Sequence, residues 1–82
     1  MRIDKFLKVS RIMKRRTVAN QACDGGRVKV NGKSVKPSFN VKEGDVVELG
    51  FNSGTLVFRI IKIKETVRKE EADGLYEIIT ED

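Results

Sequence analysis

The stretch that decides the fold is RIDKFLKVSRIMKRRTVANQACDGGRVKVNG, which spans residues 2–32 of an 82-residue chain. It contains two short amphipathic segments, then a Gly-Gly pair, an alternating segment and an Asn-Gly pair. A glycine commonly ends a helix, and Asn-Gly commonly forms the turn of a hairpin. The order therefore predicts two helices followed by a strand and a tight turn.

The first helix is expected to begin near Ile3, because Ile3, Phe6 and Leu7 have helical spacing and form a narrow apolar stripe. Asp4 falls in the first turn, where an acidic side chain suits the helix dipole. A break is expected over residues 9–13, so that this helix is separate from the next.

The second helix is expected over residues 14–23, with one of the two following glycines in the left-handed conformation at its end. Its small apolar residues, which would let the two helices approach closely, are Val18, Ala19, Ala22 and Cys23. Its start is unusual, because Lys14, Arg15 and Arg16 lie at the positive end of the helix dipole. A run of cations there predicts a bound anion, since helix N-termini already bind phosphate through free N–H groups.

Strand signals fill the rest of the chain. Strands are expected over residues 27–30, 33–35, 46–49, 55–63 and 75–79. The run 55–63 is the longest β-branched one and is the expected central strand, whereas residues 64–74 are expected to form a loop or a loose helical turn. The predicted fold class is α+β, with two N-terminal helices packed on a small, mainly antiparallel sheet of four to five strands.

Charge divides the chain into two unequal parts. Residues 1–36 hold eleven Lys or Arg and two acids, which gives +9, whereas residues 37–82 hold six basic and ten acidic residues, which gives −4. Such a concentrated positive field predicts a polyanionic partner. The aromatic residues are few and most are expected in the core, which favours phosphates of a structured RNA over stacking on single-stranded bases. The candidate RNA-binding residues are Arg2, Lys5, Lys8, Arg11, Lys14, Arg15, Arg16, Arg27, Lys29 and Lys33.

The sequence offers little for catalysis or metal binding. One cysteine and no histidine exclude an internal disulfide, the usual zinc spacings and the commonest general base. Cys23 is expected to be a small core residue, and Glu70, Glu71 and Asp73 to be solvated charges. We therefore expect no enzyme, no cofactor and no metal. The single cysteine fits a reducing cytosol. Because the sequence has no long apolar run, we expect neither a secretory signal nor a membrane span.

Five short motifs together resemble the RNA-binding domain that is named after ribosomal small-subunit protein four, also called the alpha-L RNA-binding motif. They are R-I-D-K-F-L-K-V-S-R at 2–11, K-R-R at 14–16, G-R-V-K-V-N-G at 26–32, K-P-S at 36–38 and V-K-E-G-D at 41–45. The likeness covers about residues 1–50, and residues 51–82 would add further strands to one RNA-binding domain. Because the chain has no room for a catalytic domain, it resembles the free-standing members of the heat-shock protein fifteen group.

The resemblance implies a factor of ribosome-associated quality control. Such a factor would bind stalled large ribosomal subunits through rRNA and peptidyl-tRNA, and would support alanine tailing of nascent chains with the NEMF-family factor RqcH. By position, Arg2 and Arg16 would matter most, with Lys5, Arg11 and Arg15 beside them. Many members have serine at the place of Lys14, so a helix-capping hydroxyl is missing here. We expect a cytoplasmic monomer.

Three alternatives stay open on the sequence alone. The chain could act in rescue or recycling of stalled large subunits without tailing. It could be the detached recognition arm of an RNA-modifying enzyme, or a module whose basic face meets an acidic protein. Alanine at Arg2 or Arg16 is expected to weaken RNA binding and leave the fold intact, because neither side chain points at the predicted core.

Overall fold

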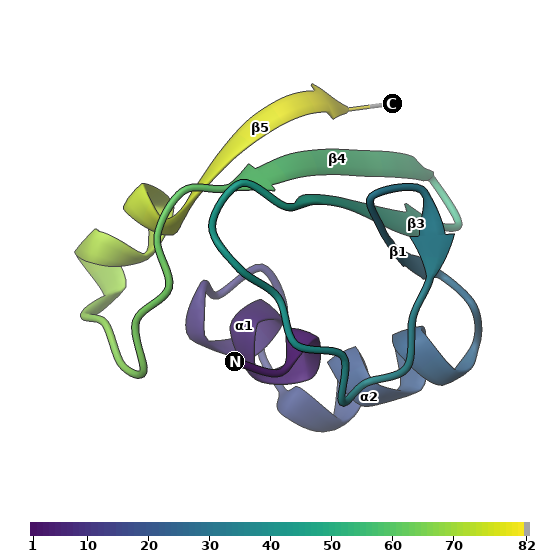
Figure 1. Ribbon diagram of the computed structural model, residues 1–82, viewed down its shortest axis with the longest axis horizontal. Helices are drawn as coiled ribbons and strands as arrows, with labels where there is room; N and C mark the ends of the chain where they lie inside the picture. Colours follow the sequence, from purple (N-terminus) through teal and green to yellow (C-terminus); the bar gives the residue numbers. More distant parts are fainter. Residues whose placement is uncertain (82) are drawn as a thin grey trace.

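Two helices form one layer of the molecule and a five-stranded sheet forms the other (Figure 1). The computed structural model describes residues 1–81. The helices are α1 (Ile3–Val9) and α2 (Arg16–Asp24), and a 3₁₀ helix, η1 (Lys69–Leu75), precedes the last strand. The strands are β1 (Val28–Val30), β2 (Lys33–Ser34), β3 (Val46–Phe51), β4 (Gly54–Ile60) and β5 (Tyr76–Glu81). Their order is β2-β1-β3-β4-β5 and every pairing is antiparallel, which confirms the predicted fold class.

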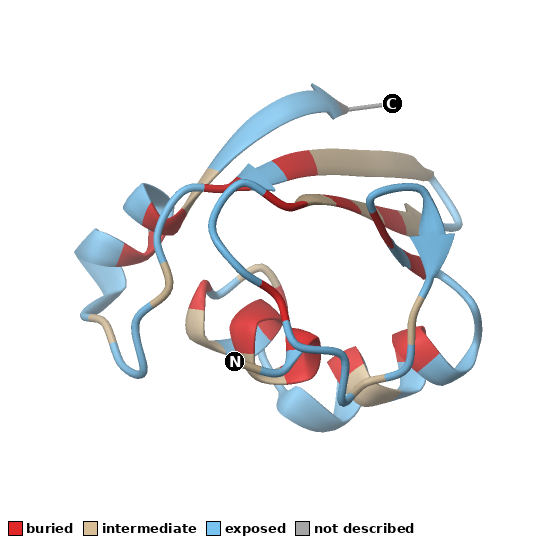
Figure 2. Cartoon of the chain, in the orientation of Figure 1, coloured by how far each residue is buried: buried red, intermediate tan, exposed pale blue. Residues whose placement is uncertain are grey.

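The core lies between the two layers, where Figure 2 shows the buried residues facing one another. The predicted stripe of α1 is its centre, because Ile3, Phe6 and Leu7 are fully buried. The ring of Phe6 stacks on that of Phe58 in β4, with centroids 6.3 Å apart. Burying each such side chain stabilises the fold by about 1.5–3 kcal/mol. These contacts fix α1 against the middle of the sheet.

The loop between β2 and β3 holds the start of α1. The N–H of Ile3 donates to the carbonyl of Phe39 at 2.7 Å, and the N–H of Asp4 donates to the carbonyl of Pro37 at 3.3 Å. The first N–H groups of a helix have no partner within the helix, so this loop satisfies two of them. Arg2 also forms an isolated antiparallel bridge with Asn40. The backbone of Arg2 is therefore fixed to residues 37–40.

The turns follow their sequence signals. Asn31 and Gly32 both have positive φ, 52° and 86°, as a type I′ hairpin turn requires. Gly26 takes the left-handed conformation after α2, with φ 75°. The Asn31 side chain also ties the turn to β3, because its Nδ2 donates to Asp45 and its Oδ1 accepts from the N–H of Val46. β1 alternates as predicted, with two buried valines around the exposed Lys29.

The second helix differs from the prediction at its start and on its apolar face. It begins at Arg16 rather than at residue 14, because Arg15 is extended, with φ −128° and ψ 138°. The preceding connector is held by the N–H of Met13, which donates to the carbonyl of Leu7, and Met13 itself is buried. Val18, which the helical spacing places on the face that approaches α1, is 45% exposed. The buried side of α2 is instead Ala19, Ala22 and Cys23.

The strand predictions are wrong at two points. β4 ends at Ile60 rather than at residue 63, because the N–H groups of Ile61 and Lys62 both turn to the carbonyl of Leu75. The centre of the sheet is β3, whereas β4 lies between β3 and β5. Among residues 1–81, no helix has the length and apolar character needed to cross a membrane.

Candidate nucleic-acid interface

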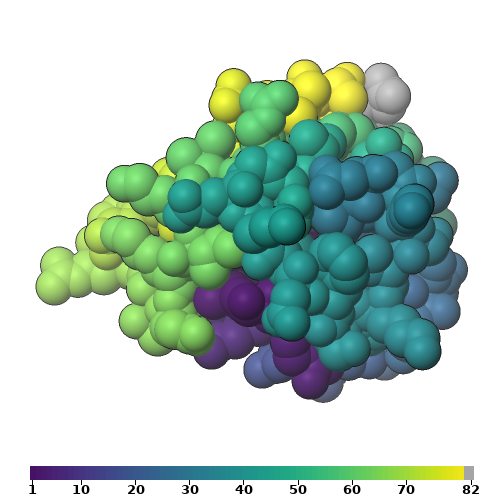
Figure 3. Space-filling view, viewed as in Figure 1, coloured from purple at the N-terminus to yellow at the C-terminus, as the bar shows by residue number. Residues whose placement is uncertain are grey.

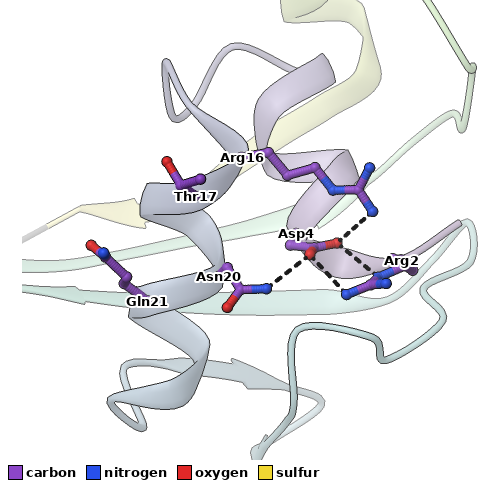
Figure 4. Close-up of a pocket in the computed structure, with 6 residues that line it drawn as sticks. All are labelled: Arg2, Asp4, Arg16, Thr17, Asn20 and Gln21. Carbon is purple, nitrogen blue, oxygen red and sulfur yellow. Dashed lines mark hydrogen bonds and ion pairs between the residues drawn. The ribbon is translucent and has the colours of Figure 1, made fainter.

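A buried carboxylate organises the start of both helices. Asp4, in α1, is 1% exposed, and two arginines and an asparagine surround it (Figure 4). Arg2 holds both of its oxygens, with Nε 3.2 Å from Oδ1 and Nη2 3.1 Å from Oδ2. Arg16 pairs with Oδ1 at 3.4 Å, and Asn20 donates from Nδ2 to Oδ2 at 3.4 Å. We call Arg2, Asp4, Arg16 and Asn20 the Asp4 clamp.

The clamp keeps Asp4 ionised and leaves a net positive charge. Burial by itself raises the pKa of Asp4, but the hydrogen bond from Asn20 and the guanidinium groups of Arg16 and Arg2 together hold that pKa below its usual value. The carboxylate is therefore charged at neutral pH, and two guanidiniums share it. The side chains of Arg2 and Arg16 remain about half exposed, at 46% and 45%. Each thus keeps N–H donors that face solvent.

The groove at the clamp carries further polar side chains. Thr17 and Gln21 line it together with the members of the clamp. In Figure 4 they lie along α2 beside Asn20, on the side away from Asp4. Hydroxyl and amide groups beside arginines are the usual donors to phosphate and sugar oxygens. The groove is open and every residue that lines it has a polar or charged group, so it suits the backbone of a nucleic acid better than a small apolar ligand.

The clamp corrects one sequence-based expectation. Arg2 and Arg16 were expected to be free of the core, so that alanine in their place would leave the fold intact. They are instead the charge partners of a buried carboxylate. Removing a partner of such a group costs stability, here about 1–3 kcal/mol because both guanidiniums are half exposed.

Sequence reasoning missed the central role of Asp4. It attributed this residue to the helix dipole alone. A signal was present, because Asp4 is the only acid among the first 23 residues, which carry seven Lys or Arg. An isolated acid within a run of cations indicates a shared ion pair more strongly than a dipole effect does.

Three further predicted residues lie outside the Asp4 clamp, namely Lys5, Lys8 and Arg11. Lys5 pairs with Glu65, which is exposed, and their hydrogen bond lowers the pKa of Glu65. Lys8 and Arg11 line a depression that also contains Glu65. In the space-filling view the start of the chain, in purple, emerges between the loop before β3 and the segment near residue 65 (Figure 3). An acid therefore accompanies this second group of cations.

Arg27 and Lys29 are not brought to the clamp. Lys29 faces away from the helices, because Val28 and Val30 on either side of it are buried in the core. It lies opposite Glu48 in the strand register, and the two line one depression with Arg27 on the outer face of the sheet. Lys14 and Arg15 are exposed and directly precede Arg16 in the chain, whereas Lys33 lies in β2. Of the ten predicted residues, the structure joins Arg2 and Arg16 through one carboxylate.

Cys23 is a core residue, as its sequence context predicts. It is 4% exposed and lies in α2. Burial raises the pKa of its thiol to about 11, and the negative charges of Asp4 and Asp24 add to the effect. The thiol is therefore protonated at neutral pH, and it is a poor nucleophile because the thiolate is the reactive form.

Comparison with known proteins agrees with this geometry. A family model described as the S4 domain matches residues 1–47, which hold both helices, the hairpin and the loop before β3. The chain therefore belongs to the S4 domain family, which confirms the resemblance seen in its motifs.

The relatives define the group within that family. The chain is 51% identical over 81 residues to the RQC P-site tRNA stabilizing factor of Streptococcus pneumoniae, covering 99% of this chain and 92% of the relative. It is 44% identical over 82 residues to the protein of that name from Bacillus subtilis, covering 100% of this chain and 95% of the relative. The chain is thus a member of the family of RQC P-site tRNA stabilizing factors.

Two solved structures share the whole fold. The trimeric structure of Vibrio cholerae Heat Shock Protein 15 superposes with a TM-score of 0.90 at 34% identity, covering 96% of this chain and 81% of that one. The solution structure of HP1423 superposes with a TM-score of 0.84 at 33% identity and covers 100% of both chains. The likeness to the heat-shock protein fifteen group is therefore confirmed in three dimensions.

Proposed function

We propose that this chain is an RNA-binding factor of ribosome-associated quality control, which binds stalled large ribosomal subunits through rRNA and the peptidyl-tRNA of the P site. Relatives that match its full length carry the name RQC P-site tRNA stabilizing factor. The observation that carries the proposal is the Asp4 clamp, which holds two half-exposed guanidiniums at the start of the two helices.

The clamp suits RNA because its donors are already ordered. A guanidinium presents a planar fork of N–H groups that matches phosphate, and a free arginine loses side-chain entropy when it binds. Arg2 is held at two points by Asp4, so part of that entropy is already lost in the free protein. Arg2 directly precedes α1 and Arg16 begins α2, so the two arginines come from different segments and can hold two neighbouring phosphates in one orientation.

The start of α2 supports the same interface. This helix begins without a side-chain cap, and Arg15 and Arg16 stand at its first turn. Cations at the positive end of a helix are unfavourable unless an anion joins them. Asp4 supplies one such anion, which pairs with Arg16 at 3.4 Å. A backbone phosphate of tRNA or rRNA would supply a second one beside the exposed Lys14 and Arg15.

The proposal also covers catalysis, cellular location, tailing and the number of copies. The chain acts without catalysing a reaction, in the cytoplasm, and it supports alanine tailing together with RqcH. A single copy is sufficient, because one chain already contains the complete clamp and a core that runs from Ile3 to Leu75. The same continuous core supports one RNA-binding domain over residues 1–82, with its RNA-binding part within residues 1–50.

Co-sedimentation with purified stalled large subunits tests the proposal. Binding should weaken steeply as salt rises, because each phosphate contact releases counterions. The Arg2→Ala/Arg16→Ala variant should bind at least about tenfold more weakly, since hydrogen bonds to charged groups are worth about 1.5–3 kcal/mol each. Adding the purified chain to a tailing reaction with RqcH should increase alanine addition.

A third substitution separates folding from binding. Asp4→Asn in the double-alanine background removes the uncompensated carboxylate, so it should recover part of the lost stability and none of the lost binding. Association like that of the wild type by a folded double-alanine variant would overturn the proposal. Conversion of any RNA nucleoside by the purified chain would overturn its non-enzymatic part.

A further inference from the structure

A second groove lies beside the loop that holds α1. It is formed by the hairpin and by the loop before β3, with a volume of about 730 Å³. The side chains that matter in its lining are Lys33, Ser34, Val35, Lys36, Ser38 and Phe39. The groove thus combines one aromatic ring and an aliphatic wall with two cations and two hydroxyl groups.

Phe39 is an exposed aromatic residue in a chain that has few. Its side chain is 39% exposed, whereas Phe6 and Phe58 are fully buried. Phe51 is similarly exposed, at 46%, so exposure alone does not mark a site. Phe39 differs because its ring lines a groove. The flat face of such a ring is the usual stacking surface for a nucleobase.

The two lysines give the groove a positive charge. Lys33 and Lys36 are exposed, and no Asp or Glu of residues 1–80 lines the groove. Among the side chains that the structure describes, neither lysine forms an ion pair. This contrasts with Lys5, which pairs with Glu65. The lining therefore fits a ligand that is both aromatic and anionic.

The groove is continuous with the Asp4 clamp through the backbone. The carbonyl of Phe39 accepts the N–H of Ile3, and Asn40 bridges to Arg2. Phe39 therefore belongs to the segment that is fixed to Arg2. The clamp and the groove are thus attached to the same short segment of backbone.

We propose that this groove binds one unpaired nucleotide of the RNA held by the clamp, with its base stacked on Phe39 and its phosphate beside Lys33 and Lys36. This inference rests on the proposed function. It changes the expectation from the sequence, in which phosphates alone were contacted and stacking had no role. An acidic protein segment fits the charge of the groove and does not use the flat face of the ring.

A pair of RNA probes tests the inference with the full chain. One is a hairpin with 2-aminopurine in a single-stranded loop, and the other is a fully paired duplex with the same number of phosphates. Phe39→Leu should weaken binding of the hairpin about five- to a hundredfold, as expected for the loss of one base–aromatic stack, and should change duplex binding less than twofold. The 2-aminopurine quenching seen with the wild type should disappear.

Matched variants keep the test independent of folding. Phe51→Leu is the control, because Phe51 is 46% exposed and lies at the end of β3, outside the groove. It should bind both probes like the wild type. Phe39→Trp should bind the hairpin at least as tightly as the wild type. Lys33→Gln/Lys36→Gln should lower the slope of log affinity against log salt on the hairpin by about 0.7, because the bound nucleotide brings one phosphate.

Several outcomes would overturn the inference. They are equal effects of Phe39→Leu and Phe51→Leu, an equal loss on hairpin and duplex, and hairpin binding by Phe39→Trp as weak as by Phe39→Leu. A Phe39 effect that appears only when RqcH is present would assign the groove to a protein. Loss of RNA binding in the Arg2→Ala/Arg16→Ala variant, without any effect of Phe39, would leave the proposed function intact and remove this inference alone.

Discussion

The Asp4 clamp and the outer face of the sheet both place cationic side chains beside an acid, but the acid is buried in the clamp and partly exposed on the sheet. In the clamp, one buried carboxylate is shared by two arginines that keep exposed donors. On the sheet, Lys29 lies across the strands from Glu48, which is only partly buried. A buried acid orders the cations around it, whereas an acid at the surface mainly reduces their field. Net charge by itself therefore does not identify a binding surface.

The largest difference in binding to stalled subunits is expected between two double variants, each of which removes two positive charges from one of these regions. Arg27→Ala/Lys29→Ala removes as much positive charge as Arg2→Ala/Arg16→Ala. It should weaken association with stalled large subunits less than about threefold, because it removes only long-range attraction that salt screens. The clamp variant should lose at least about tenfold. Equal losses in co-sedimentation at one salt concentration would show that the total positive charge, and not the clamp, determines binding.

Replacing the acid in each region should change RNA binding less, and the direction of the change tests the role of Asp4. Asp4→Asn removes one negative charge from the RNA-binding surface, so electrostatic attraction alone predicts tighter binding. If Asp4 holds the arginines in place, RNA binding should instead weaken about three- to tenfold, by the loss of one or two ordered hydrogen bonds. Glu48→Gln makes the same change of charge on the sheet and should leave binding equal or slightly tighter. Tighter binding by Asp4→Asn, measured by fluorescence anisotropy on one RNA, would remove the positioning role.

The smallest expected effect is a dependence of stability on acid. The pKa of Asp4 is lower in the folded chain than its ordinary value, so the ionised form is favoured by folding. This contribution is complete above the unfolded pKa, which is about 3.9, and is lost as the pH falls through the folded pKa. The melting temperature should therefore fall more between pH 5 and acid conditions in the wild type than in Asp4→Asn. Parallel curves for the two proteins would show that the clamp adds no pH-dependent stability.

Local signals predicted the parts of the fold that depend on few residues. The stripe of Ile3, Phe6 and Leu7 and the turn at Asn31-Gly32 follow from spacing and backbone preference. The start of α2 and the end of β4 depend on contacts with distant or irregular segments, as with the bond of Met13 to Leu7. Such bonds leave no periodic trace in the sequence.

Part of the candidate site could likewise be predicted from the sequence. Its arginines could be chosen by their likeness to a known family, and the structure joins Arg2 to Arg16 through Asp4. The role of Asp4 itself needs the packing of α1 on α2, since the two halves of the clamp are at least twelve residues apart in the chain. The exposure of Phe39 was likewise hidden, because an aromatic residue between polar ones suits a core and a groove equally.

The hydrogen bonds from Ile3 and Asp4 to the loop before β3 have a consequence for how the chain folds. A helix of seven residues, such as α1, does not persist alone in water, because nucleating its first turn is unfavourable. Residues 37–40 accept its first N–H groups and Phe58 packs on its Phe6, so α1 becomes stable only when both segments are present. A nascent chain that ends before residue 37 would therefore lack the ordered arginine pair, and affinity for RNA would emerge together with cooperative closure of the two layers.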